Sequence, residues 1–417
     1  MVLTEDEIKL RYTGFIVFLS RLISIGTGLI FTLLVTRNIS PKDYGVYGNL
    51  GDILSYFTLI STIIPFWITR FRARRWPGSL KTGLFMNTLI GLASITLYLL
   101  SIVGIMHTLQ VGLNYIPVYM VSAAMILENH ILAVFEAALY PKRPEKIGFG
   151  LLVFEVNKVI LGLLFLYVLG MGLLGALISL IIAYFCQAIF YVRLLWREFR
   201  ERIVWAYIKE WLKASTLNVY GVLGERLLVL ANIFLFIYGE EISRAYYGAS
   251  YTIASLVTYS SSLAFALYPK LLAGTRSEDI TVSMKMVLMF ALPMFLGIIV
   301  LSSDLLSILN PVYSVASPIL IILALSSLIV SVSSIFESII IGTEDFDAAA
   351  RISFKRAFKS KIFLLLTLRY IQAAIVLPST YLVLSLFPLD VVSSTLYFAL
   401  IGYAGNIIIT FAKLLKK

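Results

Sequence analysis

The sequence predicts an all-α integral membrane protein of about twelve transmembrane helices in two pseudo-symmetric six-helix lobes. Three observations predict this fold class: an apolar composition, twelve apolar stretches of spanning length, and an internal repeat. Apolar residues make up 60% and charged residues 14% of 417, and the mean hydropathy is +0.93. Soluble domains are roughly 45–50% apolar and about 25% charged. Lipid must therefore be the solvent for much of this surface.

Twelve stretches are long enough to span a membrane. A bilayer core of about 30 Å requires about 20 mostly apolar helical residues. The predicted spans are 12–36, 46–69, 83–107, 113–140, 147–169, 171–193, 215–239, 245–271, 284–303, 312–341, 362–387 and 391–413. Prolines within them do not exclude spanning helices, because neighbouring helices can satisfy the backbone groups that proline frees.

The spans divide into two predicted lobes. Residues 1–193 form the N-terminal six-helix lobe, and residues 215–417 form the C-terminal one. Residues 194–214 are predicted to be a cytoplasmic amphipathic linker that lies in the membrane interface, because its aromatic residues recur every three or four positions. These aromatic and apolar positions are Trp196, Phe199, Ile203, Tyr207 and Trp211.

The distribution of basic residues predicts the orientation. With the N-terminus inside the cell, most of the 34 lysines and arginines fall in cytoplasmic segments. Membrane proteins keep such an excess of Lys and Arg on the cytoplasmic side. The outer segments hold only Arg37, Lys42 and Arg244. We therefore expect both termini in the cytoplasm of a cell membrane protein, and we attribute the net charge of +11 to contact with membrane lipid rather than nucleic acid.

The two halves contain similar motifs in the same order. I-S-P-K-D-Y-G at 39–45 and I-S-R-A-Y-Y-G at 242–248 agree at four of seven positions. S-R-L-I at 20–23 parallels E-R-L-L at 225–228, and V-F-E-A at 134–137 parallels I-F-E-S at 335–338. Parallel repeats of this kind place a binding site near the midplane and permit alternating access. The repeat therefore indicates a transporter.

The segment R-L-I-S-I-G-T-G-L-I-F-T-L-L-V-T-R-N-I-S-P-K-D-Y-G-V-Y (21–47), with the weaker second copy, resembles the Wzx-type oligosaccharide flippases. These belong to the multidrug/oligosaccharidyl-lipid/polysaccharide (MOP) superfamily. The resemblance implies a MATE-like, V-shaped bundle in which the first, second, seventh and eighth spans line a cavity. It also implies that the cargo is a polyprenyl- or dolichyl-linked (pyro)phosphate oligosaccharide, moved across the membrane for surface polysaccharide or glycoprotein biosynthesis.

Two arginines are the candidates for binding the cargo headgroup. At ~1.5 Å per residue, Arg21 and Arg226 lie ~13 and ~16 Å from the inner ends of their spans, near mid-membrane. A charge there costs ~2.5–3.5 kcal/mol on insertion scales and usually has a function. Guanidinium groups bind phosphate bidentately. Alternatively, Arg21 could extend its charge to the inner interface, and Arg226 could pair with Glu225 or a neighbouring helix.

Other ionisable residues within the spans are candidates for ion coupling or gating. Asp52 is the first choice because it lines the expected cavity. A histidine beside a carboxylate could carry a coupling proton. The remaining candidates are Glu225, Glu128, His130, Glu136 and Glu337. The coupling ion, H⁺ or Na⁺, is left open, and no other cofactor or metal is expected.

The sequence favours a transporter over an enzyme. G-x-x-x-x-G-K-[ST] is absent, so the chain carries no P-loop ATPase site. A MATE-type drug/cation antiporter is the first alternative, and it predicts an acidic cavity. A membrane glycan polymerase or glycosyltransferase is the second, and it predicts a long catalytic loop that the spacing of spans does not supply. The expected partners are a lipid-linked oligosaccharide and membrane lipids, and a monomer is plausible.

Overall fold

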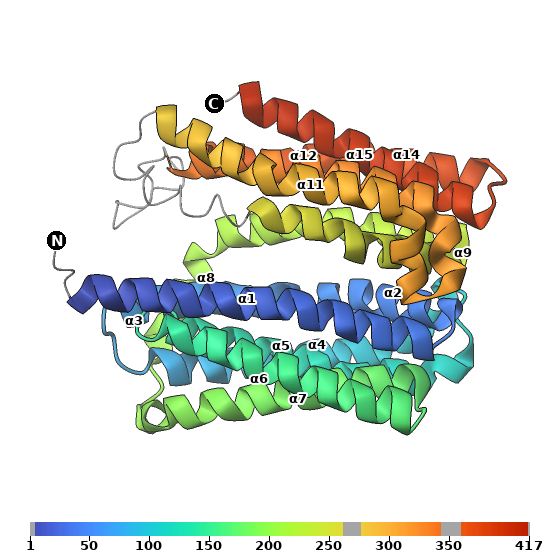
Figure 1. Ribbon diagram of the computed structural model, residues 1–417. Coiled ribbons are helices and arrows are strands. Elements are labelled where there is room, and N and C mark those ends of the chain that lie inside the picture. Colours follow the sequence, from blue (N-terminus) through green and yellow to red (C-terminus); the bar gives the residue numbers. More distant parts are fainter. Residues whose placement is uncertain (1–4, 262–276, 343–359, 416–417) are drawn as a thin grey trace. The chain divides into compact units, whose positions relative to one another are not determined.

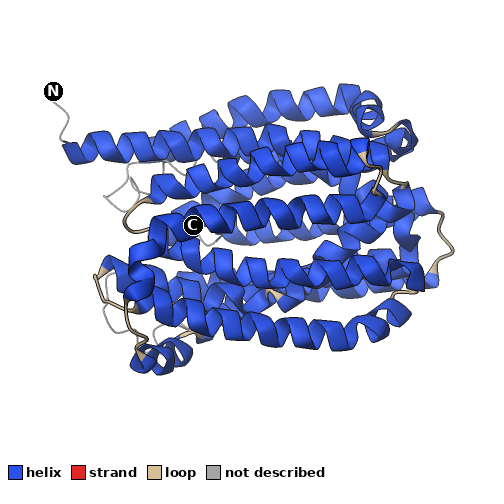
Figure 2. Cartoon of the chain, turned by 90° about the horizontal axis from the view of Figure 1, so that it is seen from below, coloured by secondary structure: helices blue, strands red, loops and turns tan. Residues whose placement is uncertain are grey.

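The computed structural model of the protein describes residues 5–261, 277–342 and 360–415. Within these ranges the regular secondary structure is helical and contains no strand (Figures 1 and 2). The all-α prediction is therefore confirmed. The end of the eighth predicted span, 262–271, lies outside the described residues.

The number of apolar helices agrees with about twelve spans. Nine described helices are long and apolar enough to cross a membrane, or ten if one bent pair is counted. One of the nine, α9 (Thr216–Thr258), is interrupted at Glu240, where φ is 70° and ψ is 166°. It therefore contains the seventh predicted span and the beginning of the eighth. The first helix, α1 (Glu5–Asn38), adds a shorter apolar stretch, Leu22–Asn38.

The chain forms two compact units. Unit 1 consists of Met1–Ile39 and Ile53–Val219. In it α1 packs against α6, α4 against α5, and α7 against both α5 and α6. Apart from α1, its helices are α3 (Ile63–Ala73), α4 (Ser79–Thr108), α5 (Ile116–Leu139), α6 (Pro144–Gly162), α7 (Gly172–Leu195) and α8 (Trp205–Ala214). The π-helical turn η3 (Leu163–Val168) extends α6.

Unit 2 is discontinuous in sequence. It takes Ser40–Asp52 from the N-terminal half and adds Tyr220–Lys417. Its N-terminal piece is most of α2 (Pro41–Phe57). In the remainder, α12 packs against α11 and α15, and α14 packs against α15. The bounds of these helices are α11 (Ser277–Leu309), α12 (Ser317–Gly342), α14 (Lys361–Leu386) and α15 (Val391–Leu415).

The second predicted span is broken rather than continuous. α2 ends at Phe57 and a short 3₁₀ turn leads into α3, bent by 56° from α2. Pro65 lies in the first turn of α3, where its missing N–H would otherwise bond to the carbonyl of Ser61. The Asn87 side chain of α4 donates to this carbonyl at 3.1 Å and to the His130 carbonyl at 2.6 Å. A neighbouring helix thus satisfies the group that the proline leaves free.

The segment 194–214, predicted to be an amphipathic linker, is not one continuous helix. α7 ends at Leu195, a 3₁₀ turn follows over Trp196–Arg200, and α8 begins only at Trp205. Two aromatic residues of α8 pack on α3, since the rings of Tyr207 and Trp211 lie 4.9 and 5.4 Å from that of Phe71, whereas Trp205 is 64% exposed. Trp211 is almost completely buried. The reason is that α3 supplies an apolar surface that covers these rings.

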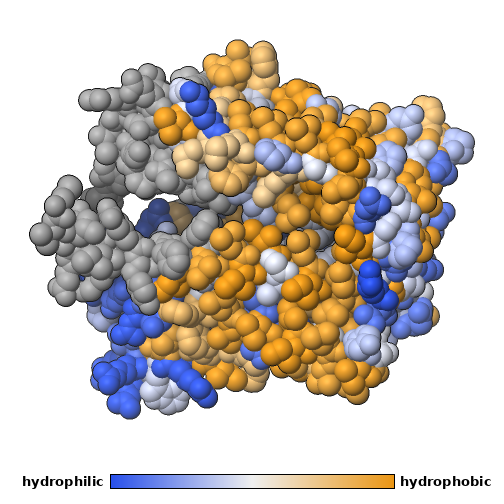
Figure 3. Space-filling view, viewed as in Figure 1, coloured by the Kyte–Doolittle hydropathy of each residue, from blue (hydrophilic) through white to orange (hydrophobic). Residues whose placement is uncertain are grey.

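The surface has the distribution expected in a bilayer. On the face drawn in Figure 3, hydrophobic side chains cover the middle of the helices, and hydrophilic ones gather near the helix ends. Large apolar side chains such as Leu100 and Val300 are about four-fifths exposed, at 80% and 79%. Exposed apolar surface of this extent requires lipid. The chain is thus a multi-pass integral membrane protein.

Candidate functional site

A polar cavity of about 460 Å³ lies within unit 2, between α2 and the two halves of α9. Such a volume is within the range of small-molecule sites, about 300–1,000 Å³. The cavity is lined by Tyr44, Tyr47, Gly48, Asp52, Leu228, Val229, Asn232, Arg244, Tyr247, Gly248, Tyr251 and Thr252. It therefore combines one ion pair, amide and hydroxyl groups, and four tyrosine rings.

The ion pair at its centre joins Asp52 of α2 to Arg244 of α9. Arg244 Nε lies 2.8 Å from Asp52 Oδ2, and each side chain is only 11% exposed. Asn232 donates its amide to Asp52 Oδ1 at 3.0 Å. Arg244 Nη2 also donates to the carbonyl of Gly48 at 3.4 Å. Because burying a charge is costly without partners, the ion pair and its hydrogen bonds offset the cost of burying these two side chains.

Glycines make room for the guanidinium group. A Cβ atom on Gly48 would lie 3.1 Å from Arg244 Cζ, and one on Gly248 would lie 3.2 Å from its Nη1. A Cβ on Gly45 would collide with the backbone of Glu241, so this glycine sets the close approach of α2 and α9. Gly45 and Gly248 are equivalent positions of the sequence repeat. The two copies of the motif thus meet around Arg244.

Four tyrosines form the walls. The rings of Tyr44 and Tyr47 stack with centroids 6.1 Å apart, and those of Tyr247 and Tyr251 stack at 5.9 Å. The Arg244 guanidinium lies 5.7 Å from the Tyr247 centroid, a cation–π arrangement. Tyr251 is 53% exposed, so much of its ring is accessible.

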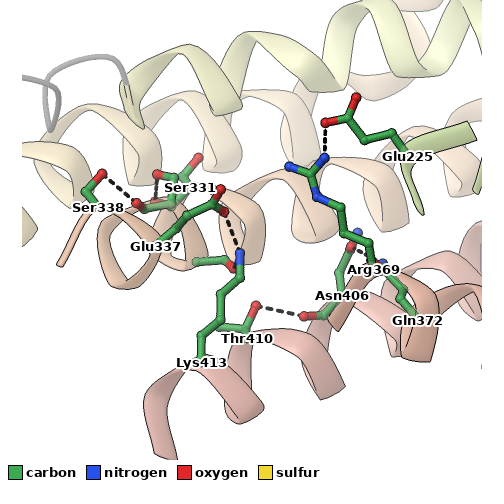
Figure 4. Close-up of polar contacts among 11 residues, drawn as sticks. Glu225, Ser331, Glu337, Ser338, Arg369, Gln372, Asn406, Thr410 and Lys413 are labelled. Carbon is green, nitrogen blue, oxygen red and sulfur yellow. Dashed lines mark hydrogen bonds and ion pairs between the residues drawn. The ribbon is translucent and has the colours of Figure 1, made fainter. Parts of the chain in front are cut away.

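A second polar cluster in unit 2 joins α9, α12, α14 and α15 (Figure 4). Arg369 of α14 forms an ion pair with Glu225 of α9. Lys413 of α15 pairs with Glu337 of α12 at 2.7 Å. Asn406 accepts a hydrogen bond from Gln372 at 2.8 Å. A basic residue on a neighbouring helix therefore neutralises each carboxylate. This arrangement fits a structural role as well as the predicted gating role.

The predicted headgroup arginines occupy different helices. Arg226 is half-buried on the first half of α9. It lies three residues before Val229, so the two share a helix face and Arg226 is about one turn from the cavity lining. Its predicted partner Glu225 pairs with Arg369 instead. Arg21 is in α1, and its side chain lies outside the described residues.

Three further candidates lie on α5 in unit 1. One carboxylate oxygen of Glu128 and the Nε2 atom of His130 are buried without a hydrogen-bond partner among the described residues. His130 Nδ1 contacts the Ile126 carbonyl at 2.8 Å. Glu136 accepts hydrogen bonds from Gln187 and Tyr191, each at 3.3 Å. Glu128, His130 and Glu136 thus belong to unit 1, whereas Asp52 belongs to unit 2.

Sequence reasoning missed Arg244 as a site residue. We expected it in an outer segment, but it is largely buried and paired with Asp52. Arg244 lies inside the second copy of the motif at 242–248, but the repeat does not reveal that it pairs with Asp52. We interpreted Arg244 as a residue near the end of a span, which indicates only the membrane topology. In the structure α9 is interrupted at Glu240, and Arg244 follows this interruption and pairs with Asp52 of α2.

Comparison with known proteins supports the fold. No protein-family model and no curated protein sequence matches the chain. Three solved structures are similar: an inward-facing multidrug resistance MATE family transporter of the MOP superfamily (TM-score 0.67, 13% identity, covering 94% of this chain and 93% of that one); an outward-facing one (0.60, 13%, 98% and 95%); and a point mutant of the Vibrio cholerae MATE transporter VcmN (0.63, 15%, 97% and 94%).

These similarities define the fold of the protein. The chain has the fold of these MATE transporters over nearly its whole length, as the alignments cover more than nine-tenths of both chains. The expectation of a MATE-like, two-lobed helical fold is confirmed. The more specific resemblance, to oligosaccharide flippases, stays a prediction.

Proposed function

We propose that this protein is a transporter that flips a lipid-linked oligosaccharide, carried on polyprenyl or dolichyl (pyro)phosphate, across the cell membrane by alternating access. The product would serve surface polysaccharide or glycoprotein biosynthesis. Both termini would lie in the cytoplasm, which follows from the distribution of Lys and Arg. H⁺ or Na⁺ remains the candidate coupling ion, with Asp52, Glu128, His130, Glu136, Glu225 and Glu337 as candidate coupling or gating residues.

One observation carries the proposal: a hydrogen-bonding cavity without net charge lies one helical turn from an intramembrane arginine. The charges of Asp52 and Arg244 cancel in the cavity. Arg226 is a basic residue about one turn from the cavity lining. A cargo with a neutral, hydroxyl-rich part and an anionic phosphate has matching chemistry. Arg21, the repeat partner of Arg226, is proposed as a second phosphate ligand.

A MATE-type drug/cation antiporter is the alternative, and the similar structures favour it through their fold, since they are described as multidrug transporters. An uncompensated carboxylate would attract an organic cation. In unit 2, however, Asp52, Glu225 and Glu337 each form an ion pair with a basic residue. Their charges are therefore less available to a cation. The second alternative, a glycan polymerase or glycosyltransferase, has no specific observation in its favour.

Transport of a fluorescent lipid-linked oligosaccharide in proteoliposomes tests the proposal. Arg226→Ala and Arg21→Ala should each slow flipping roughly 10- to 100-fold, because a charge-assisted hydrogen bond contributes about 1.5–3 kcal/mol. Arg226→Lys should retain part of the rate. Lys42→Ala is the matched control, since Lys42 forms an exposed ion pair with Glu241.

Two results would contradict the proposed function. If both alanine variants flip the saccharide lipid at the wild-type rate, the arginines do not bind its headgroup. If the wild-type protein moves an organic cation such as ethidium but not the saccharide lipid, the antiporter alternative is correct.

A further inference from the structure

We infer that the tyrosine-walled cavity around Asp52 and Arg244 is a sugar subsite, which holds a neutral pyranose ring of the cargo. The inference rests on the proposed function, because it assigns one part of the proposed cargo to one part of unit 2. The phosphate would be bound by Arg226, one turn away on α9, and the sugar by the cavity itself.

The charge of the cavity selects a neutral ligand. Asp52 and Arg244 compensate each other at 2.8 Å, so neither an anion nor a cation gains a net attraction. The place of a cation over the Tyr247 ring is already taken by the Arg244 guanidinium. An organic cation entering the cavity would therefore meet a like charge.

The polar groups are those that recognise hydroxyls. Asp52 offers only acceptors, Arg244 only donors, and Asn232 both. Asp52 and Asn232 are already bonded to each other at 3.0 Å, which fixes their orientation before a ligand arrives. A sugar ring carries hydroxyls that donate and accept at neighbouring carbons, so it can bond to such a mixed set. Sites that bond to hydroxyl groups discriminate strongly against ligands that lack them.

The aromatic rings supply the complementary apolar contact. A pyranose has apolar C–H faces, and these pack on aromatic faces while its hydroxyls stay at the edges. Tyrosine suits this contact, since it pairs an apolar ring with a polar hydroxyl. Tyr251 has the accessible face, with 53% of the residue exposed, and Tyr247 stacks behind it at an interplanar angle of 14°. The second pair, Tyr44 and Tyr47, closes another wall.

A purely structural role explains less of the arrangement. An ion pair that only joins α2 to α9 would be stabilised by close packing around it. Here a space of about 460 Å³ is left open beside the pair, with polar atoms and an exposed ring on its lining. Open space bounded by fixed donors and acceptors is the arrangement of a binding site.

Direct binding is the first test. Methyl glycosides of glucose, galactose, mannose and N-acetylglucosamine are added to detergent-purified protein, and binding is followed by saturation-transfer NMR. At least one glycoside should bind to the wild type and lose roughly ten-fold or more in affinity in Tyr251→Leu and in Asn232→Leu. Tyr238→Leu is the control, because Tyr238 is an exposed tyrosine on α9 that does not line the cavity. If no glycoside binds, or all three variants behave alike, the inference is wrong.

Transport separates this inference from the proposed function. A prenyl diphosphate that carries a saccharide and the same lipid without sugar are compared in proteoliposomes. Tyr251→Leu should reduce flipping of the saccharide lipid and leave the sugar-free lipid unchanged, whereas Arg226→Ala should reduce both. If Tyr251→Leu and Asn232→Leu slow both lipids equally, the subsite is wrong and the flippase stands. If the wild type flips neither lipid but binds a glycoside, the proposed function fails and the sugar subsite stands. Size-exclusion profiles establish that each variant is folded.

Discussion

At the scale of residues, the Asp52–Arg244 pair differs from the other ion pair between the same helices. Asp52 and Arg244 are each 11% exposed, whereas Lys42 is 57% exposed and lies 3.4 Å from Glu241. Removal of one partner of a buried pair leaves an uncompensated charge, at a cost of about 3–5 kcal/mol. An exposed pair contributes about 0–1 kcal/mol. The two pairs thus offer a comparison within one helix contact.

Double-mutant cycles on both pairs test this difference. Asp52→Asn and Arg244→Met should each lower the unfolding temperature of the detergent-solubilised protein strongly, and the double variant should be more stable than the sum of the single effects. Lys42→Met and Glu241→Gln should have small, additive effects. Unfolding followed by circular dichroism provides the measurement. Additive effects at Asp52 and Arg244 would contradict the buried pair.

At the scale of elements, the bend between α2 and α3 depends on a helix outside the pair. Asn87 of α4 satisfies the Ser61 carbonyl that Pro65 leaves without its usual donor. Ser61 is buried, and a buried carbonyl without a partner costs about 1–3 kcal/mol. The bend therefore requires both the proline on its own helix and the amide on a neighbour.

The combination of Asn87→Leu with Pro65→Ala tests this dependence. Asn87→Leu alone should be destabilising by about 1–3 kcal/mol, because it leaves the Ser61 carbonyl unbonded. In the Pro65→Ala background, the alanine has a backbone N–H that can bond to that carbonyl, so the same substitution should cost less. Thermal unfolding of the four proteins measures the difference. An equal cost of Asn87→Leu in both backgrounds would show that its bond to the His130 carbonyl is the one that matters.

The spans were predictable from the sequence because length and apolarity alone define them. The kink of the second span was not predictable. Pro65 shows only that one backbone hydrogen bond is missing, and the side-chain amide of Asn87 that compensates for it comes from a different span. Asp52 could be chosen as a site residue because a carboxylate within a span is conspicuous. Arg244 could not, because its burial depends on the contact between α2 and α9, which the spacing of residues does not reveal.

At the scale of the whole molecule, the two units do not coincide with the two halves of the sequence. Unit 2 takes Ser40–Asp52 from the N-terminal half, and Asp52 is the partner of Arg244. A C-terminal half alone would thus lack one side of the cavity and expose Arg244 without its carboxylate. The predicted lobe boundaries at 193 and 215 describe the repeat in the sequence, whereas the contacts of α2 cross them.

Expression of the chain as two fragments tests this exchange. The fragment 216–417 should be poorly folded alone and should form a stable complex when co-expressed with 1–215. Gly45→Leu in the N-terminal fragment should weaken that complex, since a side chain there collides with the backbone of Glu241. Gly26→Leu is the control, because no atom lies within 4 Å of a Cβ at that position. Co-purification yield measures both. A C-terminal fragment that is monodisperse on its own would contradict the exchange.

The packing of α8 on α3 has a spectroscopic consequence. All five tryptophans lie between Trp67 and Trp211, within unit 1, and the indoles of two of them, Trp76 and Trp211, pack against Phe71. Tryptophan emission, excited at the red edge of the absorption band, therefore reports on unit 1 and does not report on the tyrosine-walled cavity of unit 2. A fluorescent probe whose emission changes on sugar addition must be introduced into unit 2 as a new tryptophan. The native tryptophans of unit 1 then serve as an internal reference.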